Sequence, residues 1–323
     1  MLKHLPIIAI SAALAMPALA QDDRADWPTS FTVGTASQGG TYFVYGSGWA
    51  NMVSELLGVP GGAEVTGGPV QNASLVQAGD LEIGQLTLGP AAEAIAGKSP
   101  LAPGLEHDKL RALFPMYKTA FHVIVPAGNG WKTVADIPDG TVVGVGPQGG
   151  TPGTYWPRFF ETLGKDVQIQ YGGAADLASQ LQDGLIDAFA FAAGLPIPAF
   201  SQVGAQMDVD FLGFTPENAA AIAAAHPVSE FEIPAGIYPA MTEPDNSVVM
   251  WNVAVGNSDL PDSFVYALVD AVMGNNDRMV EIHKAAVETL PENVDKNGVV
   301  LWHPGAVQWF EENGHEIPDD MEG

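Results

Sequence analysis

The sequence contains no cysteine and few basic residues, and both shortages exclude classes of protein. Without cysteine, the chain of 323 residues has no disulfide framework and no cysteine to carry a lipid anchor. Only 12 lysines and arginines stand against 38 aspartates and glutamates, which gives a net charge of −26. This charge excludes non-specific binding to nucleic acid or to an anionic membrane. It is typical of a solvated acidic surface, and a cationic ligand or basic partner is the alternative; charge alone does not choose between them.

Long apolar runs are also missing, apart from a short one at the N-terminus. Residues 1–20, "MLKHLPIIAISAALAMPALA", combine Lys3, an apolar stretch and small residues at Ala18 and Ala20. This is the pattern of a signal peptide that is cleaved after Ala20. No later stretch reaches the roughly 20 apolar residues of a membrane span. We therefore expect a protein that is exported to a Gram-negative periplasm and is soluble there.

Motifs of catalysis, nucleotide binding and metal binding are absent from the sequence. No lysine follows either Gly-Gly-Thr loop, as a nucleotide-binding loop would need, and "GTASQGG" does not have G-x-G-x-x-G spacing. There is no G-x-S-x-G, and the seven histidines form no H-E-x-x-H. His122 opens the apolar run "HVIVPA" and is interpreted as a structural histidine. We expect neither an enzyme nor a bound cofactor or metal.

What the sequence does contain is an internal duplication. The loop "TASQGGTYF", residues 35–43, has a near copy in "GPQGGTPGTY", residues 146–155. Residues 66–86 and 171–191 also align without gaps, and Gly79 and Gly184 fall at the same place in the two segments. Each segment predicts a Gly-Gly turn, an amphipathic helix that ends at a glycine with positive φ, and an apolar strand.

This alternation of strands and helices predicts an α/β fold with two lobes, each a mainly parallel sheet flanked by helices. The chain is expected to cross between the lobes near "HVIVPAGNGWKTVADIPDG" and near "IPAGIYPAMTEPDNSVVMWNVAV". These crossings place lobe I at 22–123 plus 245–323 and lobe II at 124–244. The helical segments after Val255 are expected to pack on lobe I.

The two Gly-Gly-Thr loops are candidate binding corners, because a glycine turn that leads into a helix presents free backbone N–H groups and the positive end of the helix dipole. Such a corner holds a carboxylate without a lysine. Tight turns alone would explain one copy, but two copies at equivalent places favour ligand binding. Gln85 and Thr87 end the apolar strand of the first lobe, and Gly194 lies at the matching place in the second.

These residues resemble the TAXI family of solute-binding proteins, which serve tripartite ATP-independent periplasmic (TRAP) transporters. "GTASQGGTY" is similar to the family's G-T-x-S-x-G-G-T-Y signature, and "DGLIDAFAFAAGLP", "IPAGIYP" and "HPGAVQWFEENG" are similar to later family segments. The resemblance covers nearly all of the chain after the signal peptide. It implies a periplasmic binding protein of type II, a monomer with two lobes and a two-crossing hinge.

The resemblance also implies a ligand, a partner and a set of residues. Family members are associated with glutamate, glutamine, 2-oxoglutarate and related small dicarboxylates, which they pass to the membrane subunits of a sodium-driven importer. Thr87 replaces an aspartate of the family, which favours a plain carboxylate over an amino acid, and Pro152 replaces a polar or basic residue. The implied ligand-facing residues are Ser37, Gly40, Thr41, Tyr42, Gln85, Thr87, Gln148, Gly150, Thr151, Gly194 and Tyr238.

Three alternatives stay open at this point. The same fold could serve an ABC importer with a different ligand, or an exported sensor that docks on a receptor after binding. An enzyme on a similar scaffold would need a nucleophile or base in its cleft, and the loops named above offer only Ser, Thr, Gln and Tyr.

Overall fold

The computed structural model describes residues 24–323, so the predicted signal peptide at 1–20 lies outside the described residues. The strands are β1 Phe31–Gly34, β2 Gly61–Glu64, β3 Ile83–Thr87, β4 Leu110–Pro126, β5 Val142–Gly144, β6 Gln168–Gln170, β7 Ala188–Ala193, β8 Val209–Leu212, β9 Ser229–Ile233 and β10 Asp245–Asn257. The α-helices are α1 Thr41–Leu57, α2 Pro69–Ala78, α3 Leu88–Ile95, α4 Thr151–Thr162, α5 Ala174–Gln182, α6 Pro198–Gln206, α7 Pro216–Ala225, α8 Asp262–Met273, α9 Asn276–Ile282 and α10 Pro304–Glu312.

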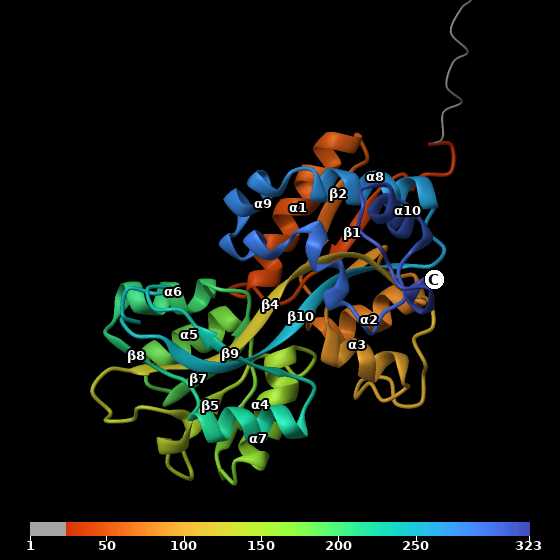
Figure 1. The fold of residues 1–323 in the computed structure, drawn as a ribbon. Coiled ribbons are helices and arrows are strands. Elements are labelled where there is room, and N and C mark those ends of the chain that lie inside the picture. Colours follow the sequence, from red (N-terminus) through yellow and green to blue (C-terminus); the bar gives the residue numbers. More distant parts are fainter. Residues whose placement is uncertain (1–23) are drawn as a thin grey trace, which may run out of the picture.

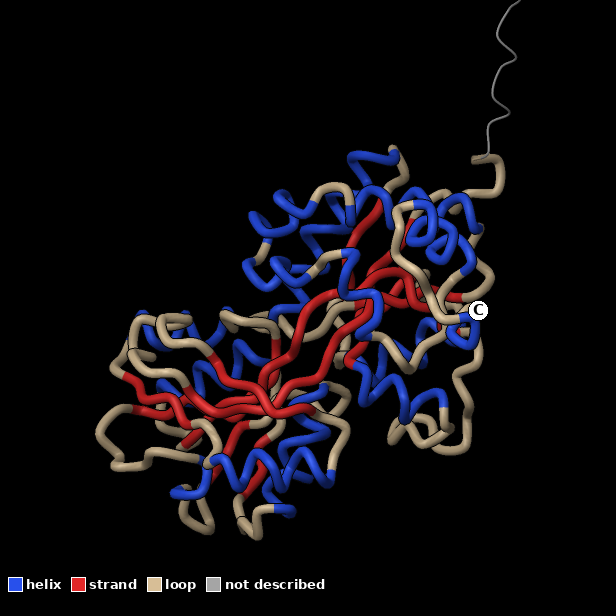
Figure 2. The backbone as a smooth tube through the Cα atoms, in the orientation of Figure 1, coloured by secondary structure: helices blue, strands red, loops and turns tan. Residues whose placement is uncertain are grey.

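All ten strands belong to one sheet, in the order β2-β1-β3-β10-β4-β7-β5-β6, with β8 paired to β4 and β9 to β10. The strands at the two ends of this order, β2-β1-β3 and β7-β5-β6, are parallel. The central strands β10 and β4 are antiparallel to each other and to their neighbours. Figure 2 shows the strands as a continuous band through both halves of the molecule, with helices on both sides.

The core divides the chain into two lobes. One cluster of buried side chains draws on residues 31–117 and 253–317, including those of α8 and α10. Two further clusters, one on each face of the sheet, draw on residues 120–250. The helices after Val255 therefore pack on lobe I, as the sequence predicts. The exact lobe limits of 22–123 plus 245–323 and 124–244 stay a prediction.

The lobes are joined by the two long strands β4 and β10, which run from one half to the other (Figure 1). At about 3.3 Å per residue, the 17 residues of β4 span roughly 55 Å, enough to reach through both lobes. Its side chains are almost all buried, because it lies at the centre of the sheet in each lobe. The chain thus crosses between the lobes in two strands of the sheet. The sequence had suggested crossings in a turn and in a Pro- and Gly-rich segment instead.

The duplicated segments fold alike. In lobe I, α2 ends at Gly79 with φ +79°, and β3 follows; in lobe II, α5 is followed by Gly184 with φ +68° and then by β7. Positive φ is cheap only for glycine, which explains the glycine at this place in both copies. The predicted helix and strand order is confirmed in both halves.

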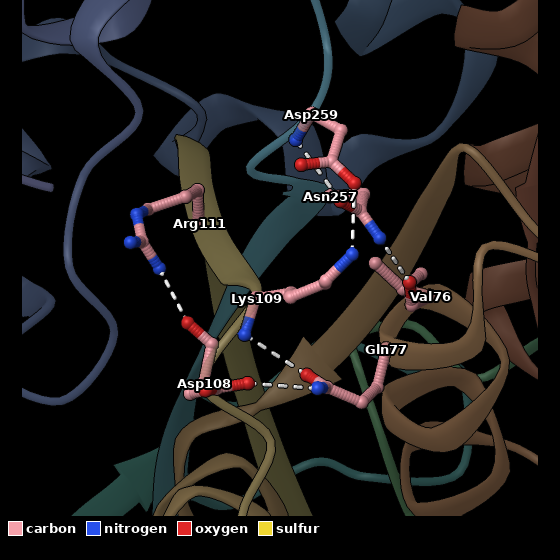
Figure 3. A network of polar contacts seen from close by, with 7 residues as sticks. All are labelled: Val76, Gln77, Asp108, Lys109, Arg111, Asn257 and Asp259. Atoms are coloured by element: carbon pink, nitrogen blue, oxygen red, sulfur yellow. Dashed lines mark hydrogen bonds and ion pairs between the residues drawn. The ribbon is translucent and has the colours of Figure 1, made fainter.

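A polar network joins the end of α2, the start of β4 and the end of β10 in lobe I (Figure 3). The amide of Gln77 at the end of α2 accepts from the backbone N–H of Lys109 and donates to Asp108. Lys109 Nζ pairs with Asp259 at 2.8 Å, and Asn257 Nδ2 donates to the carbonyl of Val76. The ion pair is exposed and screened by solvent, so the network mainly fixes where β4 begins and β10 ends.

Candidate functional site

A small cavity lies between the lobes, where β1 and β3 of lobe I and β7 of lobe II end. Its volume is about 30 Å³, room for about two water molecules, so the lobes are closed on each other. Ligands of open α/β sheets bind outside the carboxyl ends of the strands, which is where this cavity lies. The lining comes from both lobes and consists of Ala36, Ser37, Gly40, Thr41, Tyr42, Pro69, Thr87, Thr119, Pro147, Gly150, Thr151, Pro152, Phe191, Ala192 and Ala193.

Helix α1 of lobe I begins at this cavity. Its N-cap is Gly40, which has no side chain to accept from the first N–H groups of the helix. The turn before it needs glycine at position 39, where φ is +85° and an added Cβ would lie 2.9 Å from the backbone nitrogen of Ala175 in lobe II. The positive end of the helix dipole and the Thr41 side chain thus meet the other lobe directly.

Helix α4 of lobe II begins at the same cavity in the same way. Its N-cap is Gly150, again without a side-chain cap, and Thr151 and Pro152 are its first two residues. Proline is well tolerated there, since the first N–H groups of a helix have no partner inside the helix. The hydroxyls of Thr87 and Thr151 are hydrogen-bonded to each other across the cavity. A polar contact between the lobes therefore lies at the cavity itself.

Backbone hydrogen bonds between the two lobes surround the cavity. Thr41 Oγ1 donates to the carbonyl of Gly194 at 2.6 Å, and Ser37 Oγ accepts from the N–H of Ala174 at 3.1 Å. Three more bonds join main chain to main chain across the boundary: Val70 N–H to Gly149 O at 3.0 Å, Ala175 N–H to Gln38 O at 3.1 Å, and Ala199 N–H to Gly39 O at 2.9 Å. All five bonds join one lobe to the other, so they stabilise the arrangement of the lobes seen here.

A charged contact closes one side of the boundary. Arg158 on α4 holds both carboxylate oxygens of Glu93 on α3, at 2.5 and 3.3 Å, and Tyr155 Oη donates to the same carboxylate at 3.0 Å. The hydrogen bond to Glu93 raises the pKa of Arg158, which is charged in any case. We call Glu93, Tyr155 and Arg158 the interlobe latch.

Uncharged groups line the floor of the cavity. Tyr42 Oη donates to Asn252 Oδ1 at 2.6 Å, and Asn252 Nδ2 bonds to Thr119 Oγ1 and to the carbonyl of Tyr117. Burial raises the pKa of Tyr42, so its hydroxyl stays protonated. Among residues 24–323, no Asp, Glu, Lys, Arg or His lines the cavity. The polar groups at the cavity are hydroxyls and backbone N–H groups.

Seven of the predicted ligand-facing residues meet at this cavity, namely Ser37, Gly40, Thr41, Tyr42, Thr87, Gly150 and Thr151. They come from two segments more than a hundred residues apart and from the end of β3. The two helix corners account for six of them, and Thr87 is the seventh.

The other four predicted residues lie outside the lining. Gln85 is fully buried beneath α1, where its Nε2 donates to the carbonyl of Tyr42 at 3.0 Å. Gln148 is exposed, Gly194 offers its carbonyl to Thr41, and Tyr238 is buried on lobe II with its hydroxyl accepting from the N–H of Ile197.

The sequence interpretation missed several lining residues. Thr119 lies in the middle of β4, and Phe191, Ala192 and Ala193 lie at the end of β7. A threonine inside the buried run "FPMYKTAFHVIV" was a signal that could have been used, because a buried hydroxyl needs a partner. The alanines carry no such signal.

His122 has the structural surroundings that its position in the sequence indicates. Its ring is fully buried against Phe200 and Phe211, with Nε2 at 3.3 Å from the hydroxyl of Tyr238. Burial lowers its pKa to about 3, so it is neutral at pH 7. It lies away from the cavity.

Within residues 24–323 no group of three or more His, Asp or Glu side chains is arranged to hold a metal ion. Over the same span, no helix has the length and apolar character needed to cross a bilayer.

Two α/β lobes that share a sheet through two crossing strands and meet at a cavity make up the fold of type II periplasmic binding proteins, the fold class predicted from the sequence. The chain belongs to the NMT1-like family, whose model matches residues 33–314. This family has the fold of periplasmic solute-binding proteins.

Solved structures share this fold at low sequence identity. The periplasmic binding protein BugD has a TM-score of 0.59 at 14% identity, with 90% of this chain and 99% of that chain covered. MatC from Rhodopseudomonas palustris with bound malate has a TM-score of 0.57 at 15% identity, with 88% and 97% covered. An R. palustris protein with adipate has a TM-score of 0.56 at 18% identity, with 81% and 89% covered. Such identities show the fold alone.

Proposed function

We propose that this protein is the periplasmic receptor of a TRAP transporter, a member of the TAXI subfamily that acts as a monomer. It captures a small dicarboxylate, such as a C4 acid or 2-oxoglutarate, between its lobes and delivers it to the membrane subunits of the transporter. Cleavage after Ala20 and the lobe limits 22–123 plus 245–323 and 124–244 are part of the same proposal.

The observation that carries the proposal is the pair of uncapped helix N-termini, α1 and α4, at one cavity from opposite lobes. Each helix end carries about half a positive charge and stabilises an anion by about 0.3–1 kcal/mol, and by up to about 2 kcal/mol when partly buried. Two such ends match the two carboxylates of one ligand. Malate and adipate, bound by two of the proteins of the same fold, are both dicarboxylates.

The lack of charged side chains in the cavity argues against an amino acid as ligand. An ammonium group would be buried beside two positive helix ends with no carboxylate to pair with it. Thr87 stands at the place where the resembling family has an aspartate, which would have supplied that partner. A ligand without an ammonium group fits better, which places 2-oxoglutarate before glutamate.

Binding requires the lobes to move. A cavity of about 30 Å³ is too small for a four-carbon dicarboxylate, so the ligand enters when the lobes part and then takes the place of the contact between Thr87 and Thr151. Groups from both lobes then bind one ligand. The ligand stabilises the closed form over the open form by the difference between its binding free energies to the two forms.

Thermal-shift and calorimetric screening of the purified protein tests the ligand class. Malate, succinate, adipate and 2-oxoglutarate are expected to raise Tm, and 2-oxoglutarate is expected to bind tighter than glutamate. Thr151→Val removes one hydroxyl from the cavity and should weaken binding, whereas Thr154→Val, on the same helix but outside the cavity, should not. No response to any of these acids would refute the ligand class.

The transporter type needs a separate test. Membrane subunits encoded next to this gene should, in proteoliposomes with the receptor added outside, take up the bound acid when an inward sodium gradient is imposed. Uptake that needs ATP instead would identify an ABC importer.

A further inference from the structure

A second cavity, much larger than the first, lies at the hinge. Its volume is about 540 Å³, within the roughly 300–1,000 Å³ of sites for small molecules. Lys118 and Ala120 of β4 line it, whereas Thr119 between them lines the cavity described above. Since successive side chains of a strand point to opposite faces, the two cavities lie on opposite faces of β4. We call the larger one the hinge-side cavity.

Both lobes supply its walls, and most of the wall is apolar. Leu195, Phe231 and Ile237 come from lobe II, and Val280 and Val287 from lobe I. Val287 is 56% exposed, so its surface is free for a ligand. An occupant with an apolar body would bury this surface and contact both lobes at once.

Two of the 12 basic residues of this acidic chain line the same cavity. Lys118 is satisfied, because its Nζ pairs with Glu288 at 2.7 Å and lies 4.9 Å from the ring centre of Phe231. Glu288 also accepts from the backbone N–H of Lys118 at 2.8 Å. Lys284 differs, since among residues 24–323 its ammonium group has no hydrogen bond or ion pair.

We propose that the hinge-side cavity is a second binding site, for a monocarboxylate with an apolar chain of medium length, such as a medium-chain fatty acid. The carboxylate pairs with the free ammonium of Lys284, and the chain lies against Phe231, Ile237 and Val287. A cationic ligand would be repelled by the unpaired charge of Lys284, and an uncharged apolar ligand would gain nothing from that charge. An anion with an apolar tail would pair with Lys284 and bury the apolar side chains of the wall at the same time.

Titration calorimetry with sodium octanoate tests the proposal on the full-length purified protein. Lys284→Glu is expected to weaken octanoate binding about tenfold or more, the size of one charge-assisted hydrogen bond. Glu288→Gln removes the negative charge from the wall but keeps an oxygen for the N–H of Lys118, and should tighten binding. Lys132→Glu, an exposed lysine outside the cavity, is the matched control and should leave binding unchanged.

Two further measurements keep the test decisive. Val287→Asp places a like charge in the wall at an exposed position and should weaken octanoate binding, even if Lys284→Glu proves unstable. Octanol, which has the same chain without the carboxylate, should bind more weakly than octanoate. The proposal is overturned if octanoate does not bind at millimolar concentration, or if Lys284→Glu and Lys132→Glu bind it with equal affinity. It is also overturned if octanol binds as tightly as octanoate.

Discussion

Replacing Glu93 by glutamine should weaken ligand binding about tenfold, because it removes the charged contact of the interlobe latch. Glu93 lies on α3 of lobe I and receives Arg158 and Tyr155 of α4 in lobe II. The bonds form only when the lobes are closed, so the mutation destabilises the closed form and leaves the open form unchanged. Ligand affinity falls by that difference.

The magnitude follows from geometry and exposure. Hydrogen bonds to charged groups contribute about 1.5–3 kcal/mol when buried, and exposed ion pairs about 0–1 kcal/mol. The Glu93 side chain is 20% exposed and that of Arg158 is 38% exposed, so the latch lies between these limits. A loss of about 1–2 kcal/mol corresponds to roughly 5- to 30-fold in Kd, and we expect it mainly as faster ligand release.

Calorimetry and stopped-flow release with the strongest dicarboxylate of the screen would measure this effect. Glu55→Gln is the matched control, because Glu55 on α1 pairs with Arg278 on α9 and both belong to lobe I. The same charge is lost there without crossing the lobe boundary. If Glu93→Gln and Glu55→Gln have equal affinity and equal release rates, the latch does not stabilise closure and the reasoning is wrong.

Three other substitutions test the site and the core. Gly39→Ala should weaken binding by tenfold or more in calorimetry, because its Cβ would lie 2.9 Å from the nitrogen of Ala175. Gly58→Ala is its control: Gly58 also has a positive φ, but a Cβ there would meet nothing within 4 Å, so this substitution should lower Tm alone. Thr87→Asp should shift the ratio of glutamate to 2-oxoglutarate affinity at least about tenfold toward glutamate, since it supplies a partner for the ammonium; an unchanged ratio would contradict the assignment of Thr87. His122 has a folded pKa of about 3 against 6.5 when unfolded, so below pH 6.5 the unfolded chain binds a proton that the folded one does not, and stability is lost on acidification. From pH 7 to pH 5 this loss is about 2 kcal/mol, and urea unfolding of His122→Gln should show a correspondingly smaller loss than the wild type.

Local features of the fold could be read from the sequence because they depend on residues close together in the chain. Gly79 and Gly184 take positive φ after their helices, and Gly40 and Gly150 begin helices at one cavity. Each of these outcomes depends on a glycine turn and a few neighbours. The ligand-facing role of the corners stays a prediction, as does the TAXI assignment.

Features that depend on distant pairing could not be predicted in the same way. Gln85 was expected to need hydrogen-bond partners, and it has one in the carbonyl of Tyr42. It lies two residues before Thr87 on β3, and this small difference places it beneath α1 instead of at the cavity. Tyr238 is buried in lobe II with its hydroxyl at the N–H of Ile197, and its place depends on the path of a loop that no local pattern specifies.

The position of β10 in the sheet has a consequence for how the chain folds during its synthesis. Residues 245–257 insert between β3 and β4, which are themselves neither paired nor adjacent. Until the ribosome has made this late segment, β3 and β4 each have one edge without a partner strand. The core of lobe I also lacks Val253 and Val255 until then. Lobe I therefore cannot be completed while synthesis is under way. Because β3 and β4 pair with a strand that is made late, lobe I stays incomplete for most of the synthesis of the chain.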